Sequence, residues 1–97
     1  MNRNTIYING SNFTDLEGFY TEADRVLTRN LGWQTGHNPD ALNDLLRGGF
    51  GVYEYEEPVT IVWENFDQSV AALGQPLINT ILEIIASHDH ITFIKKK

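Results

Sequence analysis

Three short strand-like segments, separated by long helical stretches, are the feature of this sequence that most constrains its fold. Residues 5–9 carry alternating apolar side chains and end at Gly10, residues 58–63 form a continuous apolar run rich in β-branched residues, and residues 91–94 form the third segment. Strands joined through helices favour a parallel sheet with right-handed connections. The sequence therefore predicts a small α/β fold, a three-stranded parallel sheet with about four helices in the order β-α-α-β-α-α-β. The continuous run also predicts that residues 58–63 are covered on both faces.

The first helix is predicted from a capping signal and from apolar spacing. Thr14 and Glu17 match a capping box, in which the side chains of both residues bond the first turn of a helix. The helix is expected to end near Asn30. Its predicted inner face consists of residues spaced three and four positions apart, namely Leu16, Phe19, Tyr20, Ala23, Val26 and Leu27.

The later helices have clear boundaries in the sequence. Asn38 followed by Pro39 is typical of a helix start, and this second helix is expected to stop after Arg47 at two glycines. Asn65 is expected to cap a third, short helix that Gly74 closes. The last helix opens at Pro76 and has an apolar face of Leu77, Ile78, Ile81, Leu82, Ile84 and Ile85.

Composition and charge restrict the kinds of partner. The 97 residues are expected to form one domain, residues 1–97, and they contain no cysteine for a disulfide or a thiolate metal site. No signal peptide or membrane span is recognisable, so a cytoplasmic location is expected. The net charge is −6, and Arg47 is the only cationic residue between Asn30 and Ile94, against nine acidic residues. Such a surface repels nucleic acids and membranes and attracts basic proteins, although acidity for solubility alone is the alternative.

The second helix carries a polar face opposite its apolar one. At 100° per residue, Ala41, Leu42, Leu45 and Leu46 form a predicted buried stripe, and Asp40, Asn43, Asp44 and Arg47 lie on the other side. Asp40 and Asp44 are one turn apart and repel each other by a few tenths of a kcal/mol, which Arg47 could offset in part. Either this face is simply solvated, or its carboxylates point at a cationic partner. The polar face of the last helix, Asn79, Thr80, Glu83 and Ser87, offers the same alternatives, with Glu83 near its middle.

Catalytic and metal-binding motifs are weak. His37, Asp40 and Asp44, or His88, Asp89 and His90, could be imagined as metal ligands, but neither set has a known zinc spacing. The second set alternates sides at the entry to the last strand, so His88 and His90 are expected to share a face. No nucleophile motif is present, and the glycines at 48, 49 and 51 follow a helix instead of linking a strand to a helix. No cofactor and no enzymatic activity are therefore expected.

Two segments together resemble the barstar family, the inhibitors of barnase and related ribonucleases. Gly36, Asn38, Asp40, Ala41, Leu42 and Asp44 match the family pattern Gly-x-Asn-x-Asp-Ala-Leu-x-Asp, and Pro58, Trp63 and Phe66 match its Pro-strand-Trp-x-x-Phe pattern. The resemblance extends through residues 81–94 and implies a barstar-like fold. It also implies that Asp44 enters a nuclease active site in place of a substrate phosphate, with Asp40 and Glu83 in support.

The binding face implied by the resemblance is larger than these carboxylates. It includes Asn43 and Arg47 on the helix and Trp33, Thr35, Gly36, Gly48 and Phe50 in the flanking loops. The expected partner is a small basic ribonuclease in a one-to-one complex, with the free protein a monomer and with a bacterial immunity role that neutralises a toxin. A non-ribonuclease toxin as target, or a generic acidic interaction module, is the alternative. Arg47, Phe50 and a longer loop before Pro58 depart from the family pattern, so the target enzyme stays open.

Overall fold

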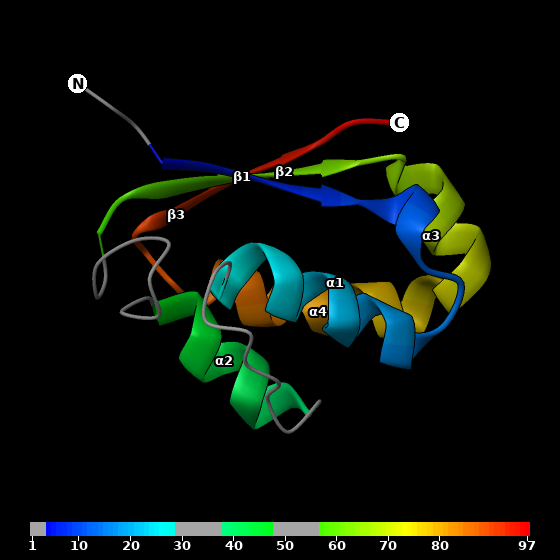
Figure 1. Cartoon of the computed structure of the whole chain (residues 1–97), viewed down its shortest axis with the longest axis horizontal. Helices are drawn as coiled ribbons and strands as arrows, with labels where there is room; N and C mark the ends of the chain where they lie inside the picture. Colours follow the sequence, from blue (N-terminus) through cyan, green and yellow to red (C-terminus); the bar gives the residue numbers. More distant parts are fainter. Residues whose placement is uncertain (1–3, 29–37, 48–56) are drawn as a thin grey trace.

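The computed structural model describes residues 4–28, 38–47 and 57–97, and it has the predicted order of elements (Figure 1). The strands are β1 (Asn4–Asn9), β2 (Val59–Glu64) and β3 (Ile91–Lys95), and a short 3₁₀ helix (Gly10–Asn12) follows β1. The helices are α1 (Leu16–Thr28), α2 (Pro39–Arg47), α3 (Phe66–Leu73) and α4 (Gln75–Ala86). Within these residues no helix is both long enough and apolar enough to cross a bilayer.

The three strands form one parallel sheet with β2 in the centre, which confirms the predicted α/β fold. Helices α1, α2 and α4 lie on one face of this sheet, with α1 and α4 under the strands and α2 farther out, and α3 lies at the end of the strands (Figure 1). Since no described helix covers the other face, the prediction that residues 58–63 are covered on both faces is wrong for the part of the chain that the structure describes. Val62 lies in register between Tyr7 of β1 and Ile94 of β3, whose side chains are 52% and 42% exposed. The two neighbouring side chains shield Val62, so its burial needs no second helical layer.

The core is centred on Trp63 of β2, whose side chain is completely buried. Its ring stacks on Phe19 of α1, with 5.4 Å between centroids, and meets Phe13 and Phe66 edge-on. The indole Nε1–H donates to the buried Ser69 Oγ at 3.0 Å, so burial leaves no polar atom of Trp63 without a partner.

Helix α1 begins one residue later than predicted. Asp15, not Thr14, caps it: the Asp15 Oδ1 accepts a hydrogen bond from the Gly18 N–H at 2.7 Å, and Thr14 lies exposed before the helix. Both residue types are good caps, and the sequence pattern alone does not separate adjacent candidates. The predicted inner face is confirmed. Its buried residues are Phe19, Tyr20, Ala23 and Leu27, and the half-buried Leu16 and Val26 pack against the core. The predicted end near Asn30 lies outside the described residues.

Glu22 of α1 is a buried carboxylate that the sequence patterns did not reveal. It accepts hydrogen bonds from the Asn9 N–H at 3.0 Å, from Asn12 Nδ2 at 3.2 Å, and from two nitrogens of Arg25 at 2.8 and 3.1 Å. Burial by itself raises the pKa of Glu22, but these hydrogen bonds and the charge of Arg25 outweigh it, so the pKa is lower than usual. Ionised Glu22 therefore ties α1 to the end of β1.

Asn65 occupies the predicted position before α3 but does not cap it with its side chain. Its backbone is left-handed, with φ of 55°, and its Nδ2 donates to Asn9 Oδ1 at 2.8 Å. This bond joins the ends of β1 and β2. Gly74 ends α3 as predicted, with φ of 89° and its N–H bonded to the Val70 carbonyl.

Candidate protein-binding face on α2 and α4

Helix α2 is fixed at its start by a cap and along its length by leucines. The Ala41 N–H donates to Asn38 Oδ1 at 2.8 Å, and Pro39 is the first helical residue, as predicted. Leu42, Leu45 and Leu46 are buried, and α2 packs against both α1 and α4. One face of α2 is thus held firmly against the core, and the other face is exposed to solvent.

The predicted polar face of α2 is present. Asp40, Asp44 and Arg47 are exposed, and Arg47 forms a loose ion pair with Asp44, with 3.8 Å between NH1 and Oδ1. The side chains of Arg47 and Asp44 are 44% and 69% exposed, so this pair contributes little to stability. Asn43 differs from the other three, because it is half-buried and faces His88.

Helix α4 presents the second predicted polar face. Asn79, Thr80, Glu83 and Ser87 are all exposed, and Ile78, Ile81 and Ile85 on the opposite side are buried. Ser87 follows Glu83 by one turn and lines the same pocket as Asn43 and Arg47 of α2. Residues from α2 and from the end of α4 therefore meet at this pocket; Asp44 directly follows the lining residue Asn43, and Glu83 precedes the lining residue Ser87 by one helical turn.

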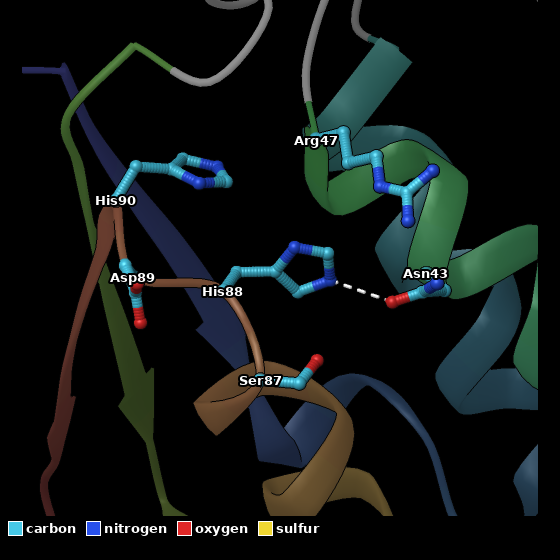
Figure 2. Close-up of a pocket in the computed structure, with 6 residues that line it drawn as sticks. All are labelled: Asn43, Arg47, Ser87, His88, Asp89 and His90. Carbon is cyan, nitrogen blue, oxygen red and sulfur yellow. Dashed lines mark hydrogen bonds between the residues drawn. The ribbon is translucent and has the colours of Figure 1, made fainter.

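Two histidines join α2 to the turn between α4 and β3 (Figure 2). His88 Nε2 lies 2.7 Å from Asn43 Oδ1, and His90 Nε2 lies 2.9 Å from the carbonyl oxygen of Leu46. The two rings are perpendicular neighbours, with 5.6 Å between centroids, which confirms that they share a face. The pocket that they line has a volume of about 480 Å³. The His-x-His spacing was the one sign of this pocket in the sequence, and no sequence pattern indicated that these histidines contact α2.

Metal binding finds no support in the part of the chain that the structure describes, where no three histidine or acidic side chains are placed to hold an ion. Both rings of His88 and His90 point toward α2, whereas the Asp89 carboxylate points away from them (Figure 2). His37 lies outside the described residues. The loop residues predicted for the binding face, Trp33, Thr35, Gly36, Gly48 and Phe50, lie outside them too.

Comparison with known proteins agrees with this fold. The sequence model of the family described as Barstar (barnase inhibitor) matches residues 3–91 of the 97, from β1 to the first residue of β3. A search of curated proteins finds no significant match. The family consists of inhibitors of the barnase type and not of enzymes. Since the match spans nearly the whole length, the chain belongs to the barstar family.

Proposed function

We propose that this protein binds a small basic ribonuclease and blocks its active site with Asp44 of α2, supported by Asp40 and Glu83. The observation that carries this proposal is the division of α2 into two faces, one buried through three leucines and one with exposed carboxylates. A ribonuclease active site is cationic, because it must bind RNA and stabilise a phosphate-centred transition state. Carboxylates on a rigid helix mimic that phosphate at small entropic cost, since the helix is ordered before binding.

Charge supports the same partner. With a net charge of −6, the protein attracts a basic enzyme at long range and speeds the encounter. Fast capture suits an immunity protein that must neutralise a toxic bacterial nuclease before RNA is cut. We place this action in the cytoplasm, where the RNA is, and we propose that a free monomer forms a one-to-one complex.

A panel of nucleases tests the proposal. The purified protein is assayed at about micromolar concentration against barnase, several barnase-like and toxin ribonucleases, and a toxin deoxyribonuclease. We expect inhibition of at least one ribonuclease at one-to-one stoichiometry. The matched variants are Asp44→Asn, which should lose inhibition, and Asp67→Asn on α3, which removes the same charge away from α2 and should keep it.

The pattern of inhibition separates the alternatives. Inhibition of the deoxyribonuclease alone would mean that the fold serves a different toxin. Absence of binding to every nuclease would overturn the proposal and favour a generic acidic interaction module.

A further inference from the structure

The pocket between α2 and the α4–β3 turn places the cationic Arg47 within a largely acidic face. Arg47, Asn43, Ser87, His88, Asp89 and His90 line it. The single acid of this set, Asp89, turns its carboxylate away from the histidine rings, whereas Arg47 lies above Asn43 on the α2 side (Figure 2). The Arg47 side chain and the two imidazole rings therefore line a hollow beside Asp44.

Arg47 creates an electrostatic problem for the proposed complex. Its contact with Asp44 is long, at 3.8 Å, and both side chains are well exposed. If Asp44 turns to the cations of a ribonuclease, Arg47 loses its partner and faces a basic enzyme. A cation enclosed in an interface without a counter-charge weakens binding strongly. The complex can avoid this cost if the partner supplies an acid at this place.

We propose that this pocket receives an acidic side chain of the partner ribonuclease, with the carboxylate held by Arg47 and the Asn43 amide beside the two histidines. This inference rests on the proposed function, because the acid belongs to the same ribonuclease that Asp44 would block. It makes Arg47 a specificity residue: a ribonuclease with an acid here is bound, and a ribonuclease with a cation or an apolar group here is rejected.

The pocket is built before any partner arrives. A carbonyl oxygen only accepts hydrogen bonds, so the contact with Leu46 requires that His90 carries a proton on Nε2. In the same way His88 Nε2 donates to Asn43 Oδ1, which leaves the Nδ2 of Asn43 as the donating end of that amide. Ser87 Oγ already donates to the Ile84 carbonyl at 2.7 Å. Among the described residues that line the pocket, the Arg47 guanidinium and the Asn43 amide are donors for a carboxylate, and the two histidines help to hold α2 beside them.

A first experiment tests the chemistry of the pocket without any nuclease. The isotope-labelled full chain is titrated with sodium acetate, and with sodium chloride at equal ionic strength, while NMR follows the Asn43 side-chain amide, the Arg47 Nε–H and the ring signals of His88 and His90. We expect saturable changes with acetate only. Arg47→Gln should abolish them, and Lys96→Gln, which removes the same charge from the end of the chain, should keep them. Equal changes with chloride, or saturation that survives in Arg47→Gln, would overturn the inference.

A second experiment uses the ribonuclease that the panel shows to be inhibited most strongly. Arg47→Gln should raise its Kd by about tenfold, and neutralising one acid of the ribonuclease should raise it similarly, with the two changes not additive. Lys96→Gln should change the Kd by less than about twofold. If Arg47→Gln tightens the complex, Arg47 is only a repelling charge, and this inference fails while the proposed function stands. If no ribonuclease is inhibited, the proposed function fails, and the acetate titration still decides whether the pocket holds a carboxylate.

Discussion

Replacing Asp44 by alanine should separate binding from stability. In the folded protein the change removes an exposed ion pair at 3.8 Å, which contributes about 0.3 kcal/mol. It also relieves the repulsion from Asp40 by a similar amount, and alanine is a better helix former than aspartate by about 0.5 kcal/mol. The free energy of unfolding should therefore stay the same or rise by about 0.5 kcal/mol. For a domain of this size the melting temperature then changes by no more than about 4 °C.

Binding should respond in the opposite direction. Asp44→Ala leaves the cations of a nuclease active site enclosed without a counter-charge, which typically costs about 3–5 kcal/mol. The Kd should rise by at least about 100-fold, and by more than in Asp40→Ala or Glu83→Ala. Thermal melts and titration calorimetry of the three variants give both quantities. A melting temperature lowered by more than about 8 °C would show that Asp44 is structural, and an unchanged Kd would show that it lies outside the interface.

Variants at three further positions test the fold. Glu22→Gln should destabilise the protein by about 2 kcal/mol at pH 7, because the ionised Glu22 accepts four hydrogen bonds. Folding lowers the pKa of Glu22, so its contribution to stability is complete above the unfolded pKa of about 4.3 and is lost as the pH falls through the folded pKa. Urea unfolding at a series of pH values should therefore show a weaker loss of stability in acid for the variant than for the original protein. Gly10→Ala should cost about 2 kcal/mol or more in the same assay, because an added Cβ would lie 2.5 Å from the Asn65 carbonyl oxygen. Asn38→Ala should cost about 1 kcal/mol through loss of the α2 cap, and Asn38→Asp should restore most of it, as thermal melts can show.

The features that were predicted correctly from the sequence are those set by residues close together along the chain. Helical periodicity identified the exposed side of α2 and α4, and Asp40, Asp44 and Glu83 are exposed as predicted. The α2 cap is also local, since Asn38 bonds an amide only three residues ahead. The resemblance to the barstar family rested on the same local motifs, and the family match confirms it.

The features that the sequence did not predict are contacts between residues far apart along the chain. Asn65 takes a left-handed conformation while its side chain reaches Asn9, 56 positions away. The bond between His88 and Asn43 spans 45 positions, and the residues next to each of them in the sequence give no sign of this contact. Periodicity treats a polar residue as exposed unless a partner is known, so both contacts escape it.

The anchoring of α2 and its proposed binding chemistry use different side chains. Three buried leucines, the Asn38 cap, and the bonds that Asn43 and Leu46 form with two histidines hold the helix. None of these contacts involves Asp40 or Asp44, whose side chains project to solvent. Changes in the acids or in Arg47 should therefore alter the proposed choice of nuclease with little loss of fold stability. Changes in the histidines would instead remove the contacts to Asn43 and Leu46, and so weaken the support of the helix that carries the groups proposed to meet the partner.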